Sequence, residues 1–323
     1  NELYYDKEYA KLYLKREGEV FDFELNKGEY FFKNIALKKP ISYIGNRKVN
    51  DGFYDLETPY GYGGYLTNCT DEDFINQAFL EYSKKAKDEN VIAEFLRFNV
   101  FNKFHENHKE HLNLCAKERN TVAIDLNQTE DELLFSYKTN LRRDINRAKR
   151  DGLVFSFLEK TQETISLFTD LYLSTMSKVR ADSFYYFDLE FLKNLISQEK
   201  IKIAAVSYGN KIINCTLIIE ESELVYYHLS ASDREYSKLN GTALLLHSVA
   251  CNYLLNKTTF FLGGGNSINE KDPLFRFKQK FNPNKTHPFY IGGNIFHDKY
   301  YEYCEMRQNQ SEENIPYFLK YRF

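Results

Sequence analysis

The spacing of apolar residues predicts alternating strands and helices along the whole chain. In the first part, short apolar runs at 29–37, 40–45, 91–98 and 120–126 indicate strands. Residues 71–89 differ, because their apolar side chains recur every three or four positions between acidic residues at the start and lysines at the end. That arrangement is typical of an amphipathic helix whose charges complement its dipole.

The second part begins near residue 127 and continues the alternation. Gly152 supplies a stop for a helix over 130–150, and Gly209-Asn210 marks a hairpin turn. The other predicted helices lie at about 162–178, 188–198, 241–255 and 273–280, and the predicted strands at 154–158, 201–207, 211–220, 223–230, 259–262 and 286–296. An antiparallel meander followed by a helix and a further strand favours an α+β fold with mixed, mostly antiparallel sheets. A doubly wound parallel sheet would need a crossover between all its strands.

Composition narrows the class of protein. The chain has 323 residues, of which 43% are hydrophobic and 28% charged, so it is globular and long enough for two domains. Its net charge of −3 gives no general electrostatic case for DNA or an anionic membrane as partner. Any site for a polyanion must therefore be a local patch.

Cysteines and hydropathy indicate a compartment. The five cysteines are scattered and form no CxxC pair, which favours free thiols in a reducing environment over disulfides or a zinc site. No apolar run approaches the roughly 20 residues that span a bilayer, and charge begins at the second residue. We therefore expect a cytoplasmic protein without a transmembrane segment.

Three segments carry a resemblance to a known family. They are FYDLETPYGYGGY at 53–65, LRRDINRAKRDG at 141–152 and LGGGNSINEKDPLFRFKQKF at 262–281. In order and spacing they resemble the Fem family of peptidoglycan-bridge aminoacyltransferases and its GNAT-type acetyltransferase relatives. The resemblance implies two tandem GNAT-like domains packed around a central cleft, which we place at 1–127 and 128–323. Residues 97–99, Arg-Phe-Asn, depart from the Arg-Phe-His common among relatives, and the chain resembles the compact members without a coiled-coil arm.

Candidate substrate-binding residues come from the first two segments. In the family context, Tyr60, Tyr62 and Gly63 belong to a cleft loop that lines an acceptor pocket; alone, they read as a structural turn. Arg142 and Arg143 differ by about 100° of helix rotation, so only one of them can face a cleft. Such charge suits a diphosphate or a tRNA backbone, and a solvated basic face is the alternative. The third segment adds one further substrate-binding candidate, Arg276.

Candidate donor-binding residues lie at two turns. A strand–turn–helix passage holds Asn240, Gly241 and Thr242, where GNAT enzymes offer backbone N–H groups to the pyrophosphate of coenzyme A; an ordinary helix start is the alternative. The glycine run Gly263, Gly264 and Gly265 lets the chain pass tightly between strand and helix. A phosphate-cradling role for this run lacks the usual motif context.

The resemblance implies a catalytic lysine in the third segment. A cation beside the reacting carbonyl would stabilise the developing oxyanion, and we assign this role to Lys278 first and to Lys280 second. The alternative for either residue is a lysine that extends along the surface. His228, on a predicted strand, is a candidate base, although such a histidine is more often simply hydrogen-bonded.

A metal centre is not predicted. His105, His108 and His111, followed by Cys115, have a spacing that invites a metal site, but their segment FHENHKEH is highly polar and indicates a solvated helix. No metal or redox cofactor is implied by these residues.

The leading hypothesis is a cell-envelope N-acyltransferase. It would move an acyl group from acyl-CoA, such as acetyl-CoA, to an amino group of an amino sugar or peptide acceptor, itself nucleotide- or lipid-linked. The second hypothesis is a Fem-type enzyme that uses aminoacyl-tRNA to extend a peptidoglycan peptide stem. The third, from another class, is a non-catalytic binding module that keeps the fold. Direct transfer needs proximity and oxyanion stabilisation and no protein nucleophile.

Overall fold

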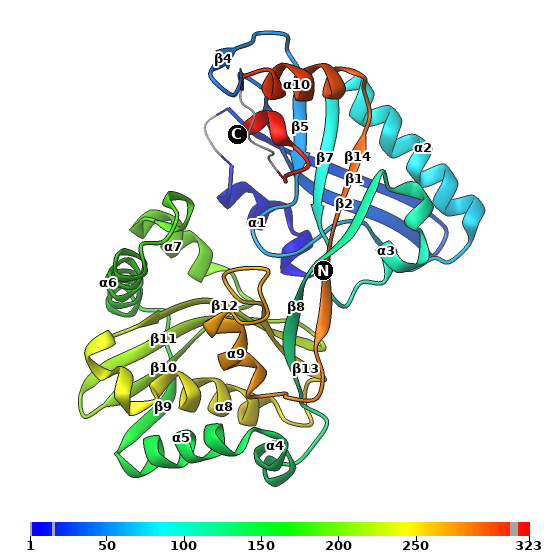
Figure 1. The fold of residues 1–323 in the computed structure, drawn as a ribbon. Helices are drawn as coiled ribbons and strands as arrows, with labels where there is room; N and C mark the ends of the chain where they lie inside the picture. Colours follow the sequence, from blue (N-terminus) through cyan, green and yellow to red (C-terminus); the bar gives the residue numbers. More distant parts are fainter. Residues whose placement is uncertain (1, 15–16, 311–315) are drawn as a thin grey trace. The chain divides into compact units, whose positions relative to one another are not determined.

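The computed structural model describes residues 2–14, 17–310 and 316–323, which form two compact units. The first comprises Asn1–Glu118 and Pro288–Phe323, and the second comprises Arg119–His287. This division differs from the predicted one at 127/128 in two ways. The strand before residue 127 already enters the second unit, and the last segment of the chain returns to the first. The passages fall within β8 (Leu114–Asp125) and β14 (His287–Ile295) (Figure 1).

The first unit is built on a mixed sheet with the strand order β1-β2-β5-β7-β14. Only β5 and β7 run parallel, because α2 (Glu72–Asp88) supplies the crossover between them. Its remaining elements are η1 (Leu3–Tyr5), α1 (Lys7–Leu12), β1 (Glu19–Lys27), β2 (Tyr30–Pro40), the ribbon β3 (Tyr43–Ile44) and β4 (Arg47–Lys48), β5 (Tyr54–Glu57), β6 (Leu66–Thr67), β7 (Val91–Arg97), α3 (Phe104–Asn107), η2 (Lys109–His111), α10 (Lys299–Gln308) and η5 (Lys320–Arg322).

The helix α2 shows how the sequence determines these elements. The carboxylate of Asp71 accepts the N–H of Phe74 and so caps the helix start. Acidic residues fill the first turn and lysines the last, which suits the helix dipole. The apolar positions between Phe74 and Ala86 are buried in the core of the unit. The predicted amphipathic helix is therefore confirmed.

The second unit repeats this plan. Its strand order is β8-β13-β12-β11-β10-β9, and only β12 and β13 are parallel, with α8 (Gly241–Tyr253) as their crossover. Each unit thus joins one parallel strand pair through a helix beside antiparallel strands. The remaining elements are α4 (Glu130–Ser136), α5 (Thr139–Arg150), β9 (Leu153–Leu158), α6 (Gln162–Val179), η3 (Ser183–Tyr185), α7 (Leu189–Ser197), β10 (Ile201–Tyr208), β11 (Lys211–Glu220), β12 (Leu224–Ser232), η4 (Arg234–Leu239), β13 (Thr259–Gly263) and α9 (Pro273–Gln279).

The predicted single helix over 130–150 is wrong in one respect, because it is two helices. Tyr137 has the extended angles φ −72° and ψ 154° and ends α4. Its ring is buried, 5.1 Å from the ring of Phe281, and the N–H of Lys138 donates to the carbonyl of Lys280. These contacts with the segment after α9 take the place of continued helix.

None of the helices in the described part of the chain combines the length and the apolar character needed to cross a bilayer.

A buried carboxyl group sits in the core of the first unit. Glu94 on β7 is fully buried, accepts the hydroxyl of Tyr82 at 2.6 Å and lies 3.4 Å from the amide nitrogen of Asn294. Burial raises the pKa of Glu94 to about 8, and the Asn294 contact only partly offsets this. Near neutral pH the folded protein therefore holds a proton that the unfolded chain, with a carboxyl pKa near 4.5, has released.

Glu94 should make the folding stability fall as pH rises. Because the folded state binds the extra proton between about pH 4.5 and 8, the free energy of unfolding is expected to fall by about 1.4 kcal/mol per pH unit in this window. Glu94→Gln, which is neutral at every pH, should remove this slope in urea unfolding at pH 5, 6.5 and 8. The exposed Glu72→Gln is the control and should keep it. A slope that is unchanged in Glu94→Gln would contradict the assignment.

Candidate functional site

The parallel strands of the second unit separate toward their carboxyl ends. β12 pairs with β13 only over Leu224–Tyr226 and Thr259–Phe261. Beyond this point the pairing of β12 with β11 contains a bulge. Ile218 pairs with Tyr227 and Thr216 pairs with Ser230, so β12 has one residue more than β11 between these two pairs. Such a bulge bends a strand and interrupts its ladder. The carboxyl ends of parallel strands are the usual place for ligands in α/β sheets.

Lys278 projects from α9 to this end of the sheet. The carboxylate of Asp272 caps α9 by accepting the N–H groups of Leu274 and Phe275. The ammonium nitrogen of Lys278 donates to the carbonyl of Gly264 at 2.8 Å, and it lies 5.4 Å from the ring centroid of Tyr227. Lys278 thus contacts Tyr227, the first residue of β12 beyond its pairing with β13, and Gly264, which directly follows β13.

The environment of Lys278 shifts its protonation. Its side chain is only 7% exposed. Burial lowers the pKa of Lys278 to about 7; the nearby Asp272 carboxylate opposes this fall and the Arg119 guanidinium adds to it. A strongly shifted pKa at the carboxyl end of a strand pair is typical of a functional group. Near neutral pH, Lys278 exchanges between ammonium and amine.

The glycine run supports this lysine. A Cβ on Gly264 would lie 2.9 Å from Arg119 Cδ, and one on Gly265 would lie 2.4 Å from Asp272 Oδ1. The Arg119 guanidinium donates to the carbonyl of Gly265 at 2.8 Å, as Lys278 does to Gly264. Gly263 adopts φ +77° and is buried. The carbonyls of Gly264 and Gly265 therefore accept from cationic side chains, and Gly263 pairs with Val122 in the sheet. These contacts support a packing role more than a phosphate cradle.

The start of α8 suits an anion. Asn240 has the left-handed angles φ 59° and ψ 32°, and its carbonyl accepts the N–H groups of Ala243 and Leu244. No acceptor among the described residues takes the N–H groups of Gly241 and Thr242. Asn214 approaches closely, since a Cβ on Gly241 would lie 1.8 Å from its Oδ1, and it donates to the Thr242 hydroxyl at 3.0 Å. A helix start with spare N–H groups is an anion site in principle.

The other catalytic candidates are less well placed. Burial lowers the pKa of His228 to about 3, so it takes up a proton too weakly to serve as a base near neutral pH. Lys280 is half-buried with its ammonium 5.9 Å from the ring of Phe277. Arg276 is exposed on α9. Arg276 and Lys280 each lie two positions from Lys278. Two positions are about 200° of rotation around a helix, so neither side chain shares the helix face of Lys278.

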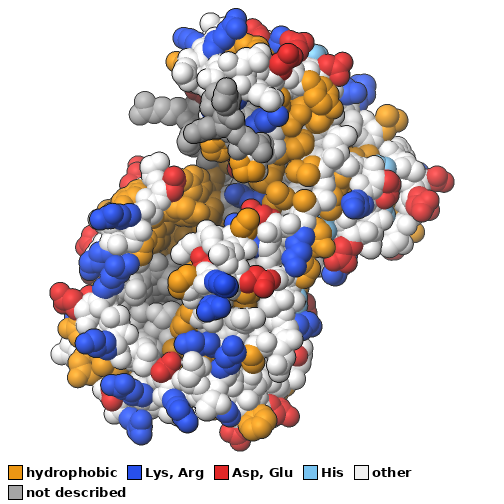
Figure 2. All heavy atoms as spheres, viewed as in Figure 1, with side chains coloured by type: hydrophobic (Ala, Val, Ile, Leu, Met, Phe, Trp, Pro, Cys, Tyr) orange, Lys and Arg blue, Asp and Glu red, His pale blue; other side chains and the backbone are white. Residues whose placement is uncertain are grey.

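The two arginines of α5 diverge as predicted. Arg142 is half-buried, lies 5.5 Å from the ring of Phe135 and donates to Thr139. Arg143 is exposed and lines a surface hollow with Asn146, Lys149 and Arg150. Figure 2 shows lysine and arginine side chains gathered over the face where Figure 1 places α5. The described contacts of Arg142 stay on α4 and α5, so the structure does not join it to Lys278.

The loop with Tyr60, Tyr62 and Gly63 lies in the first unit. The Arg97 guanidinium holds this loop by donating to the carbonyls of Thr58 and Pro59 at 2.9 and 2.7 Å. Gly63 also forms a parallel β-bridge with Phe98. Both tyrosines are half-buried, with ring neighbours that include Tyr13 for Tyr60 at 5.6 Å and Phe289 for Tyr62 at 5.5 Å. Its sharing of a cleft with Lys278 stays a prediction.

The predicted solvated helix at 104–111 is wrong. Only Phe104–Asn107 is α-helical, Lys109–His111 forms a short 3-10 turn, and His105 and His108 are buried. The ring of His105 stacks 4.9 Å from Phe98, and the ring of His111 stacks 4.4 Å from Phe79 at 6°. The imidazoles serve as flat packing surfaces for aromatic rings from other elements, which a polar local sequence does not reveal.

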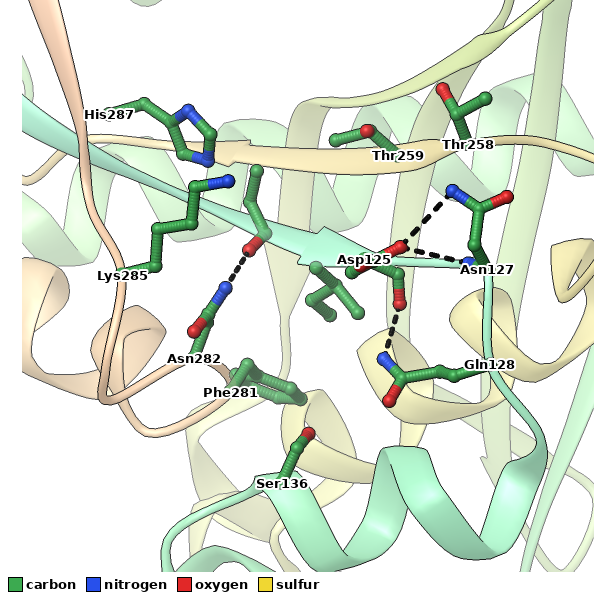
Figure 3. A pocket seen from close by; sticks show the side chains of 12 residues that line it. Asp125, Asn127, Gln128, Ser136, Thr258, Thr259, Phe281, Asn282, Lys285 and His287 are labelled. Atoms are coloured by element: carbon green, nitrogen blue, oxygen red, sulfur yellow. Dashed lines mark hydrogen bonds between the residues drawn. The ribbon is translucent and has the colours of Figure 1, made fainter.

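A separate polar pocket of about 390 Å³ lies in the second unit at the other end of β13. Figure 3 shows Lys285 and His287 on one wall and Asp125 on the opposite side, with Thr258 and Thr259 at the start of β13. No predicted site residue lines it. Gly264 lies five positions after Thr259, roughly 17 Å of extended chain, so the Thr259 side of this pocket is at the end of β13 away from Gly264.

Sequence reasoning missed three residues that surround Lys278. Asp272 carried a signal, because an acidic residue directly before Pro273 is a typical helix start. Arg119 and Tyr227 carried none, since they reach Lys278 only through the pairing of strands distant in sequence.

Comparisons with known proteins agree with this geometry. Residues 136–279 match the family model described as an acetyltransferase (GNAT) domain, a range that contains α5–α9 and β9–β13 and includes Lys278. A sequence search among curated proteins finds no match. The fold is similar to the crystal structure of FemX, with a TM-score of 0.71 at 13% identity over 92% of this chain and 93% of that one.

Two further solved structures are similar to this chain in fold. One is the C-terminal domain of a putative lysylphosphatidylglycerol synthetase from Agrobacterium fabrum, with a TM-score of 0.58 at 14% identity over 94% and 91% of the two chains. The other is L-PGS from Bacillus licheniformis, with a TM-score of 0.57 at 13% identity over 90% and 88%. The predicted resemblance and the predicted α+β fold of two GNAT-like parts are confirmed, and the comparisons support the coarser functional prediction of an acyltransferase.

Proposed function

We propose that this chain is an N-acyltransferase in which Lys278 stabilises the transition state. The observation that carries the proposal is the placement of Lys278: a buried amine with a pKa near 7, held at the carboxyl ends of the separated strands β12 and β13. The ammonium form would donate to the carbonyl oxygen of the donor as negative charge develops there.

The proposed reaction is direct transfer between two bound substrates. The acceptor amine attacks the thioester carbonyl, a C–N bond forms, the C–S bond breaks, and the proton lost by the amine ends on the departing thiolate. The protein supplies orientation and charge stabilisation and no covalent nucleophile. The buried His228 agrees with this, because its lowered pKa makes it too weak a base to activate a protein nucleophile.

The proposed donor is acyl-CoA, with acetyl-CoA as the first case to test. Support comes from the match to a GNAT domain and from the start of α8, where the N–H groups of Gly241 and Thr242 have no acceptor among the described residues and could donate to a pyrophosphate. The acceptor class, an amino sugar or peptide amine of a cell-envelope precursor, follows from the resemblance of the three segments to the Fem family, and a cytoplasmic location goes with it.

Aminoacyl transfer is the second candidate function. It is favoured by one observation, the similarity to a structure named as a domain of a putative synthetase of lysylphosphatidylglycerol, an aminoacylated lipid. In that case the donor would be an aminoacyl-tRNA, and the basic face of α5 would be the place for its backbone.

Thermal unfolding of the purified chain with each donor separates these proposals. Acetyl-CoA should raise the midpoint, and acetyl transfer to an amino-sugar nucleotide should follow by mass spectrometry. Protection by aminoacyl-tRNA alone would replace acyl-CoA by the second candidate. Protection by neither donor, together with binding of the amino-sugar nucleotide, would favour a non-catalytic binding module and reject both transfer reactions.

A further inference from the structure

Three different metal-ligating side chains meet on α4 and α8 of the second unit. His247 and Cys251 lie four positions apart on α8 and so share one face of this helix. Glu130 is the first residue of α4. The ligand atoms of Glu130, His247 and Cys251 all lie within 4.8 Å of one another, the one group of three or more such residues in the described part of the chain.

The separations between these atoms fit a shared ion. Cys251 Sγ lies 3.6 Å from either ring nitrogen of His247, and His247 Nε2 lies 3.8 Å from Glu130 Oε1. A tetrahedral zinc ion with ordinary bond lengths places sulfur and nitrogen ligands about 3.6 Å apart, and nitrogen and oxygen ligands about 3.4 Å apart. A small rotation of the side chains would therefore bring all three atoms onto one ion.

His247 is 1% exposed and lies on α8. Its described polar contacts are the two long ones to Cys251 and Glu130, so a bound ion would displace no strong hydrogen bond.

Tyr137 is an independent sign of something polar at this place. It is 2% exposed, and its hydroxyl has no hydrogen-bond partner among the described residues. Its ring lies edge-on to His247 with 5.8 Å between the ring centroids. A buried hydroxyl without a partner is costly, and a metal-bound water would supply one.

We propose that Glu130, His247 and Cys251 bind a borderline divalent cation such as Zn²⁺, with a water as fourth ligand that Tyr137 holds by a hydrogen bond. Nitrogen, sulfur and carboxylate ligands together favour zinc over magnesium or calcium. On binding, the Cys251 thiol releases its proton to solvent and coordinates as the thiolate. The ion would tie the start of α4 to α8.

One neighbouring cation opposes binding. The ammonium of Lys149 lies 3.8 Å from Glu130 Oε1, where it pairs with the carboxylate that the ion would use. Its side chain is 46% exposed and can turn to solvent. Removing this charge by Lys149→Gln should tighten metal binding, because a like charge beside the ion is lost.

The proposed metal site is separate from the proposed donor-binding turn, because Cys251 lies ten residues, or about 15 Å, along α8 from Gly241.

Cobalt titration of the tag-free, full-length protein tests the site. One equivalent of Co²⁺ should produce the near-ultraviolet absorption of a thiolate–cobalt bond, and Zn²⁺ should displace it. Cys251→Ala should abolish the band, whereas Cys115→Ala, which removes another half-buried thiol located in the first unit, should keep it. Glu130→Gln changes an exposed residue and should weaken Co²⁺ binding by about tenfold or more without unfolding.

The outcomes are decisive in both directions. Absence of a thiolate band with Co²⁺ in excess overturns the proposal, as does a band that survives Cys251→Ala. A band that is lost in Cys251→Ala but has the same affinity in Glu130→Gln rejects the three-residue site in favour of a lone thiol. Tighter binding in Lys149→Gln would support the placement of the ion beside Glu130.

Discussion

Lys278→Met is expected to lower kcat by about 10²–10³-fold, the usual loss when one donor to a developing oxyanion is removed. The structural reason is the contact set of this amine, which donates to Gly264 and faces Tyr227 where the paired part of the sheet ends. Lys280→Met removes a half-buried lysine of the same segment and should leave kcat near the wild-type value. Steady-state kinetics of both variants with the donor identified by thermal shift makes the comparison.

The pH dependence distinguishes Lys278 from a merely structural lysine. Because the pKa of Lys278 is lowered to about 7, the active ammonium is lost as pH rises through 7, and this part of the rate should fall. Lys278→Met should lack this descending limb. An unchanged kcat, or the same descending limb in the variant, would refute the assigned role.

The same substitution should not unfold the protein. A lysine whose pKa falls from 10.5 to about 7 on folding is penalised in its charged form, by roughly 1.4 kcal/mol per unit at and below neutral pH. The unfolded chain binds the proton more tightly, so this penalty disappears as pH rises from 7 to 10.5. Lys278→Met should therefore unfold at a midpoint equal to or above that of the wild type at pH 7, which separates lost activity from lost folding.

Local patterns in the sequence determined most of the elements. Caps, dipole charges and apolar spacing identified α2, α8 and the strands β10–β12, all of which the structure confirms. The strand β1 was missed although Phe21 and Phe23 alternate into the core, because charged residues lie between and beside them. The break at Tyr137 was missed because its cause, packing against Phe281, lies far along the chain.

The candidate site was predictable only in part, for the same physical reason. Lys278 was found through the segment that contains it, and α9 forms from local signals. Its shifted pKa depends on burial and on Arg119, and its contact with Tyr227 depends on the register of β12. His247 and Cys251 are near each other in sequence, but Glu130 joins them only after α4 packs beside α8. Long-range packing therefore creates the chemistry that the sequence leaves implicit.

The carboxyl-terminal segment is anchored by a buried ion pair in the first unit. The Asp55 side chain is fully buried on β5 and accepts from Arg322 Nε at 2.7 Å and Nη2 at 2.6 Å, as well as from the Tyr321 hydroxyl at 3.0 Å. The same Nη2 donates to the carbonyls of Lys39 and Pro40. The guanidinium of Arg322 thus bonds to the Asp55 carboxylate on β5 and to two backbone carbonyls on β2, and it connects η5 to both strands.

Arg322→Ala is expected to destabilise the first unit by about 3–5 kcal/mol, because it leaves the Asp55 carboxylate buried without its counter-charge. Asp55→Asn should cost less alone, and the double variant should recover part of the loss, since no uncompensated charge then remains buried. Urea unfolding of the two single variants and the double variant measures this coupling. Strictly additive losses would show that the pair contributes no interaction of its own, and that η5 is held by Tyr321 and its ring neighbours, Tyr300 and Tyr303, instead.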